Sequence, residues 1–281
     1  MAFIEFVKAT LLGIIEGITE WLPVSSTGHM ILFDELLRLD VTDDFKEMFL
    51  VVIQLGAILA VPILFWDRLW PFSKDRSRAE KSRVYSLWLK VIVGALPAAV
   101  VGALLDDILD TYLYNHITVS VALIIYGIAF ILVESLKSRS GFRIDSVYDI
   151  TYADALRIGA FQVLSLIPGT SRSGATILGA LLIGVARPAG AEFTFFLAIP
   201  VMVGASGIKA LGFLSYVSES AVSVPTMAWV VLLVGCAVSF AVSMAAIRFL
   251  MDFVKKHSFA PFGVYRIALG ALVLIFGLIR G

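Results

Sequence analysis

The sequence predicts an all-α integral membrane protein with six transmembrane helices and two re-entrant helical hairpins, arranged as an inverted-topology repeat. The first supporting observation is composition: of 281 residues, 59% are hydrophobic and 16% charged, and the mean hydropathy is +0.94. Soluble domains carry about 25% charged residues, so a soluble fold is excluded. The 22 basic and 22 acidic residues cancel, so no net field attracts nucleic acid. The other two observations are six unbroken apolar stretches and two interrupted ones.

The six unbroken stretches are long enough to cross a bilayer, because each approaches the roughly 20 mostly apolar residues that a transmembrane helix needs. They are residues 48–66, 88–105, 117–133, 193–214, 227–249 and 262–279. We expect residues 1–281 to form a single polytopic membrane domain.

The two interrupted stretches are predicted to form re-entrant hairpins. Residues 3–33 are broken by Glu16, Glu20 and a polar turn, and residues 155–185 are broken by the turn at residues 167–174. Irregular backbone at membrane depth is tolerated only where protein buries it or where it lines a wet cavity. We therefore expect two pairs of half-helices around a shared cavity.

Basic residues predict the orientation of the chain. The loop between the first two spans contains six of them, Arg68, Lys74, Arg76, Arg78, Lys81 and Arg83. The positive-inside rule makes this loop cytoplasmic, so the first hairpin enters from outside and the second from inside. Three spans separate the hairpins, which makes the two halves, about 1–135 and 150–281, inverted. A motif at residues 13–28 recurs in part at 159–174, and such repeats place a ligand site at their interface.

Four ionisable residues lie inside the interrupted stretches: Glu16, Glu20, His29 and Arg172. Such groups cost about 2.5–3.5 kcal/mol each on insertion scales, so each is a candidate functional residue. Glu16 and Glu20 lie one turn apart on the same helix face. A divalent cation, a shared proton or an arginine would relieve their repulsion; alternatively, both acids face interfacial water.

The two polar turns have the composition of an anion site. The first contains Ser25, Ser26, Thr27 and Gly28, and the second contains Gly169, Thr170, Ser171, Arg172, Ser173 and Gly174. Each precedes an apolar helix, whose N-terminal amides and dipole favour anions, and the arginine fork suits phosphate. Taken singly, the hydroxyls are typical of helix caps and His29 of a structural histidine. Together with the two acids, these groups favour phosphate or diphosphate as the ligand.

Two ordered strings in this chain resemble the signatures of a known family. Residues 16–29, EGITEWLPVSSTGH, and residues 168–174, PGTSRSG, are similar to the motifs of the undecaprenyl-diphosphate phosphatase family, also called bacitracin-resistance proteins. The resemblance implies a bacterial inner-membrane enzyme that removes the terminal phosphate of a C55 isoprenoid diphosphate and recycles the carrier lipid for peptidoglycan and other envelope polymers. It also implies bacitracin resistance, dependence on a divalent cation, Mg²⁺ or Ca²⁺, and an active site open to the periplasm.

Hydrolysis gives these residues specific roles. Ser26 is the first choice as nucleophile, activated by His29 or Glu20, and the alternative is direct attack by water with Glu20 as base. Arg172 and the other residues of the two turns are expected to bind the diphosphate. Glu16 and Glu20 are the candidate metal ligands.

A second class of function fits the same pattern. A transporter or flippase could bind the same head group, because inverted repeats with re-entrant hairpins are typical of transporters. A two-histidine phosphatase mechanism is disfavoured, because the chain has three histidines and His116 and His257 are predicted on opposite sides of the membrane. The expected partners are a polyprenyl diphosphate lipid and the bilayer, without nucleic acid. A homodimer is allowed, because the glycines of residues 270–277 permit close helix packing.

Overall fold

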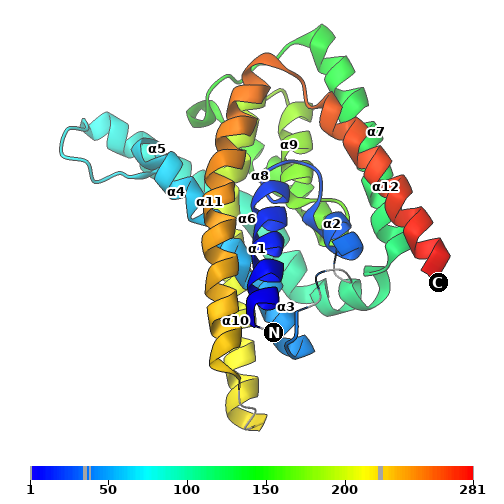
Figure 1. Ribbon diagram of the computed structural model, residues 1–281. Coiled ribbons are helices and arrows are strands. Elements are labelled where there is room, and N and C mark those ends of the chain that lie inside the picture. The colour runs from blue at the N-terminus through cyan, green and yellow to red at the C-terminus, as the bar shows by residue number, and fades with distance from the viewer. Residues whose placement is uncertain (1, 34–36, 38, 221–223, 281) are drawn as a thin grey trace.

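The computed structural model describes residues 2–33, 37, 39–220 and 224–280 as a bundle of helices (Figure 1). Six segments are long and apolar enough to cross a membrane: Asp43–Leu64, Arg78–Leu105, His116–Lys137, Arg187–Ser220, Thr226–Lys256 and Ala260–Ile279. The six predicted spans are thereby confirmed. The all-α class is confirmed as well, since the described ranges contain no β-strand. This is a multi-pass membrane protein.

The helices follow one another with short connections. Their bounds are α1 Ala2–Thr19, α2 Ser26–Phe33, α3 Asp43–Ile58, α4 Ala60–Leu64, α5 Trp66–Leu69, α6 Arg78–Leu113, α7 His116–Ser140, α8 Tyr152–Val163, α9 Arg172–Leu182, α10 Arg187–Ser220, α11 Thr226–Lys256 and α12 Ala260–Arg280. Two short 3₁₀ turns, Val147–Asp149 and Leu164–Leu166, flank α8. Both interrupted stretches therefore break where the sequence predicted, between α1 and α2 and between α8 and α9.

The first helix of each broken pair packs closely on a long helix of the other half. Helix α1 lies along α11 (Figure 1), and α8 lies along α6. Both contacts depend on glycine: a Cβ at Gly13 would lie 2.7 Å from the Gly235 carbonyl oxygen, and one at Gly159 would collide with the Gly94 backbone. The two pairs are thus packed in corresponding ways. Re-entrant insertion and the inverted repeat stay predictions.

Helices α7 and α12, one from each half, form the most extensive contact between described helices (Figure 1). A Cβ at Gly127 would lie 2.7 Å from the Gly263 carbonyl oxygen, and one at Gly270 would lie 2.9 Å from the Ser120 carbonyl oxygen. Gly277 faces His116 just as closely. The glycines of residues 270–277 are therefore used inside the chain. The predicted homodimer must use another surface and stays a prediction.

A buried acid fixes the start of α12. Glu134 on α7 accepts hydrogen bonds from Arg187 Nη2 at 2.7 Å and from the backbone N–H of Phe259 at 2.7 Å. The carboxylate is 3% exposed, so its charge is balanced by a guanidinium rather than by water. This arrangement joins α7, α10 and the residue that precedes α12.

The first span bends before it leaves the bundle. Pro62 has no N–H for the Ile58 carbonyl, and its ring would crowd that carbonyl in a straight helix, so α3 ends at Ile58 and α4 begins at Ala60. The α4–α5 segment then extends to one side of the bundle (Figure 1). Trp66 and Trp70 stack there with ring centroids 4.6 Å apart, as interfacial aromatic residues do.

Candidate active site

The two polar turns adopt the same unusual backbone conformation. Ser25 and Ser171 have φ values of 73° and 69°, the two positive values among described non-glycine residues. Each hydroxyl accepts a hydrogen bond from the N–H three residues on, Gly28 at 3.4 Å and Gly174 at 3.2 Å. Both serines therefore cap the helix that follows, as the capping alternative predicted. Positive φ outside glycine costs energy and is concentrated at functional sites.

The turns contact each other directly. The Ser173 hydroxyl donates to the Leu22 carbonyl at 3.3 Å and lies 3.1 Å from the Ser171 hydroxyl. This contact holds the N-terminus of α9 against the segment that joins α1 to the first turn. The structure therefore brings together two segments that the sequence predicted to meet.

Arg172 and Glu20 form an ion pair between the two halves. Arg172 donates to Glu20 Oε1 from Nη2 at 2.9 Å and from Nε at 3.3 Å, and its Nη1 donates to the Thr194 carbonyl at 3.2 Å. Both side chains are about one tenth exposed, 11% and 10%. The Arg172 guanidinium also lies 5.9 Å from the Trp21 ring centre. The guanidinium is thus held in a fixed orientation at the junction of the halves.

A cavity of about 210 Å³ opens at this junction. Six predicted site residues line it: Glu20, Ser26, Thr27, Gly169, Ser171 and Arg172. Five residues were not predicted: Gln54, Ser165, Val201, Met202 and Ala205. The cavity therefore combines a guanidinium, hydroxyl groups, an amide and a carboxylate with an apolar edge from α10.

The other residues of the two turns are not among those that line the cavity. Ser25, Thr170 and Ser173 are buried. The two glycines leave no room for a side chain, because a Cβ at Gly28 would lie 2.9 Å from Leu123 Cδ1 and one at Gly174 would lie 2.9 Å from Arg266 Nη1. In the structure these residues shape the turns, and contact with substrate stays a prediction for them.

His29 makes contacts that tie α2 to α12. The Ser25 carbonyl can only accept, so Nδ1 of His29 donates to it at 2.7 Å. Nε2 of the neutral ring then accepts from the Tyr265 hydroxyl at 2.7 Å, and the two rings are stacked. His29 is not among the residues that line the cavity. Both ring nitrogens are engaged, which favours Glu20 over His29 as the group next to Ser26.

Glu16 lies one turn before Glu20 and is almost fully buried, with 2% exposure. Its Oε1 atom has no hydrogen-bond partner, and its carboxyl group interacts with that of Glu20. Among the described residues no cluster of three or more His, Cys, Asp or Glu side chains could hold a metal. Two carboxylates nevertheless fit Mg²⁺, which is commonly held by one or two carboxylates together with phosphate oxygens of a substrate.

Arg266 is a site residue that the sequence analysis missed. Its guanidinium is fully buried and donates to the Pro23 carbonyl at 3.2 Å, to the Gly169 carbonyl at 2.9 Å and to the Thr170 carbonyl at 2.8 Å. It therefore links both turns from α12. The sequence could have indicated it, because Arg266 is a lone arginine within the apolar stretch 262–279. A charged side chain inside a membrane span is costly and therefore a candidate functional residue.

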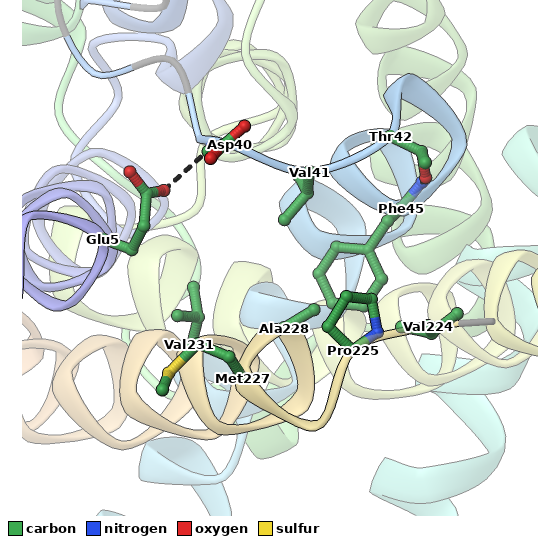
Figure 2. A pocket seen from close by; sticks show the side chains of 10 residues that line it. All are labelled: Glu5, Asp40, Val41, Thr42, Phe45, Val224, Pro225, Met227, Ala228 and Val231. Carbon is green, nitrogen blue, oxygen red and sulfur yellow. Dashed lines mark hydrogen bonds between the residues drawn. The ribbon is translucent and has the colours of Figure 1, made fainter. Parts of the chain in front are cut away.

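A larger cavity of about 410 Å³ lies near the start of α1 and contains none of the predicted site residues (Figure 2). It is lined by Glu5, Asp40, Val41, Thr42, Phe45, Val224, Pro225, Met227, Ala228 and Val231. Glu5 accepts a hydrogen bond from the Asp40 backbone N–H at 2.8 Å, drawn as the dashed line in Figure 2. The lining has carboxylates and no basic side chain, so it is unsuited to an anion.

The helical bundle and the smaller cavity define a multi-pass membrane protein in which a guanidinium, hydroxyl groups and a carboxylate line one cavity at the junction of two broken helical pairs. The chain belongs to the family described as bacitracin resistance protein BacA, whose model matches residues 9–272. The resemblance drawn from the two motifs is thereby confirmed.

Curated relatives agree with this assignment. The chain is 53% identical over 276 residues to a protein of Enterococcus faecalis named undecaprenyl-diphosphatase, with 97% of each chain covered. A protein of the same name from Acetivibrio thermocellus is 51% identical over 274 residues, which cover 97% of this chain and 98% of the relative. Another, from Lactococcus lactis subsp. lactis, is 52% identical over 283 residues, which cover 98% of each chain. These names give no support to the transporter alternative.

Proposed function

We propose that this chain hydrolyses undecaprenyl diphosphate to undecaprenyl phosphate and inorganic phosphate, as the names of its relatives state for them. The observation that carries the proposal is the position of Arg172, whose guanidinium shares one cavity with the Ser26 hydroxyl and the Glu20 carboxylate. Such an enzyme recycles a carrier lipid for peptidoglycan and other envelope polymers and confers resistance to bacitracin. We place it in the bacterial inner membrane with the cavity open to the periplasm, on the support of the basic loop between the first two spans.

Substrate binding follows from charge. A diphosphate accepts hydrogen bonds and carries negative charge, so it competes with Glu20 for the donors of Arg172. The first-turn amides of α2 and α9 have no acceptors within their helices and favour an anion. Phosphoryl transfer requires mainly positioning and charge stabilisation, which these groups supply.

Two routes then lead to products. In the first, Ser26 Oγ attacks the terminal phosphorus and its proton passes to Glu20, while the bond to the bridging oxygen breaks and undecaprenyl phosphate leaves with the electron pair. Water then cleaves the phosphoserine. In the second, water attacks directly and gives its proton to Glu20. Ser26 and Glu20 line the same cavity, which supports Glu20 as base in either route.

Glu16 and Glu20 are the residues that would hold a divalent cation, Mg²⁺ or Ca²⁺, in the alternative in which Glu20 acts as a metal ligand and not as the base. The unpartnered Oε1 of Glu16 and its contact with a second carboxylate support this proposal. When bound, such a cation neutralises charge that develops on the phosphate oxygens.

The same site supports the architectural proposal. Ser25 and Ser171, with matching φ values and matching caps, are equivalent positions of two re-entrant hairpins in an inverted repeat. The repeats then span about 1–135 and 150–281, and the two helix N-termini approach the cavity from opposite sides of the membrane.

Phosphate release from purified protein tests the function. In detergent, where no compartments exist for transport, the wild-type chain with Mg²⁺ is expected to release one phosphate per C55 diphosphate, and Glu20→Gln is expected to lose nearly all activity. Glu47→Gln is the matched control, because Glu47 is exposed and forms an ion pair with Lys209. Absence of phosphate release from well-folded wild-type protein would overturn the proposal.

A further inference from the structure

Gln54 is a polar residue in an apolar run of α3, within the span Asp43–Leu64. Its side chain lines the cavity together with Glu20, Ser26 and Arg172. Among the described residues none hydrogen-bonds to its carboxamide. An amide in a membrane span is retained at a cost and usually finds a partner, so its partner is to be sought in the cavity.

The backbone around Gln54 is held firmly between two neighbouring helices. A Cβ at Gly56 would collide with the Cys236 backbone on α11, so the two helices are in close contact. On the other side, the Ser206 hydroxyl of α10 donates to the Val51 carbonyl at 2.9 Å. The backbone that carries Gln54 therefore has a fixed place in the cavity wall, which limits the positions that its side chain can reach.

We propose that the carboxamide N–H of Gln54 donates a hydrogen bond to the diphosphate of the bound lipid, from the α3 wall of the cavity. The proposal rests on the proposed function and adds a substrate contact on a helix outside both broken pairs. The donor end is used because an ionised diphosphate offers only acceptors. Arg172 supplies positive charge from the second turn. Gln54 adds a directional hydrogen bond that orients the diphosphate without a second positive charge.

The experiment compares Gln54→Met, which keeps the shape and removes the donor, with wild type in detergent. Hydrogen bonds to charged groups contribute about 1.5–3 kcal/mol, so KM for the C55 diphosphate is expected to rise about 10- to 100-fold. The inhibition constant of methylenediphosphonate, a head group without a tail, is expected to rise by the same factor. Val52→Ala is the control, because Val52 is on the same helix but packs on a hydrophobic cluster and does not line the cavity.

Gln54→Glu provides a second, isosteric variant. Its ionised carboxylate repels the diphosphate, so the ratio of its kcat/KM to that of wild type is expected to fall at neutral pH and to recover as the new carboxyl is protonated. A purely structural role would give a ratio that does not change with pH.

Three results would overturn the inference. Unchanged KM and inhibition constant in Gln54→Met would show that the amide does not touch the diphosphate. If kcat fell while KM and the inhibition constant stayed unchanged, Gln54 would contact the attacking water and not the diphosphate. A pH-independent ratio for Gln54→Glu would show a structural role. Failure of the proposed function is distinct, because the wild-type protein itself would then release no phosphate.

Discussion

Nη2 of Arg172 lies 2.9 Å from Oε1 of Glu20, although 152 residues separate them in the chain. Because both side chains are largely buried, neither charge can be balanced by water alone, and removing either partner leaves an uncompensated charge. The pair therefore keeps the cavity assembled before substrate arrives. An anionic substrate changes the balance by offering Arg172 an acceptor that competes with Glu20.

Arg172→Lys is expected to lower kcat/KM for the C55 diphosphate about 100-fold. Arg172 uses Nε, Nη1 and Nη2 on two acceptors at once, and a lysine ammonium is a single point donor that cannot reproduce this fork. Phosphate release in detergent measures the effect, with Arg248→Lys on the exposed face of α11 as control. A loss of less than about twofold would contradict the assignment of Arg172 as a forked clamp.

Ser26→Ala separates the two chemical routes. If Ser26 is the nucleophile, the variant is expected to lose about a thousandfold in kcat, and rapid quenching of wild type followed by mass spectrometry should show phosphorylated Ser26. Ser165→Ala is the matched control, because Ser165 lines the same cavity while its hydroxyl donates to the Gln162 carbonyl at 2.7 Å. Near-normal turnover by Ser26→Ala would assign the attack to water.

The spans and the two turns could be predicted because they depend on local composition. Runs of apolar residues determine a helix in lipid, and a polar turn within such a run forces a break, as at Ser25 and Ser171. The meeting of the two breaks was expected, and an arginine was one of three ways to relieve the repulsion of the acids, but the specific pair of Glu20 with Arg172 comes from the structure. What the sequence could not indicate is rotation about a helix axis.

Three residues show this limit. Gln54 and Arg266 lie in ordinary spans, and only the packing of α3 and α12 turns them toward the cavity and the turns. His29 sits in the predicted motif, yet α2 directs its ring toward Tyr265. A pattern in one segment carries no information about which neighbour a side chain will face.

Arg266→Met is expected to lower both stability and activity. The change leaves the Pro23, Gly169 and Thr170 carbonyls without their donor, and unsatisfied buried groups cost about 1–3 kcal/mol each. The temperature of thermal unfolding in detergent should fall by at least about 5 °C, and kcat/KM should fall in the fraction that stays folded. Arg248→Met serves as the exposed control; equal unfolding temperatures for the two variants would contradict the role of Arg266.

Chelation tests the two acids as a cation site. EDTA is expected to abolish phosphate release by wild type, and added Mg²⁺ to restore it, because phosphate oxygens need a counter-charge beside Glu16 and Glu20. Glu16→Gln should raise the half-saturating Mg²⁺ concentration about tenfold, whereas Glu47→Gln should not. Activity that survives complete chelation would remove the cation from the proposal.

Asp154 predicts a pH dependence of stability at the start of α8. Burial alone would raise the pKa of this carboxyl, but hydrogen bonds from the Thr151 side chain and backbone and from Arg143 outweigh it and lower the pKa. The ionised form is thus favoured by folding, so its contribution is present at neutral pH and is lost as pH falls through the lowered pKa.

Asp154→Asn is therefore expected to reduce stability at pH 7 by about 1 kcal/mol, since one partner, Arg143, is largely exposed. The difference in unfolding temperature from wild type should shrink in acid, where Asp154 itself becomes neutral. Fluorescence-monitored unfolding between pH 7 and pH 3 measures it. A gap of constant size across that range would show that the Asp154 charge makes no contribution.

The link from Arg266 to both turns also sets an order of assembly. Helix α12 follows α1, α2, α8 and α9 in the chain, so the carbonyls of Pro23, Gly169 and Thr170 gain their donor only after both turns have been synthesised. During synthesis Glu20 and Arg172 therefore precede the residue that links their turns, and a chain truncated before α12 would lack that link.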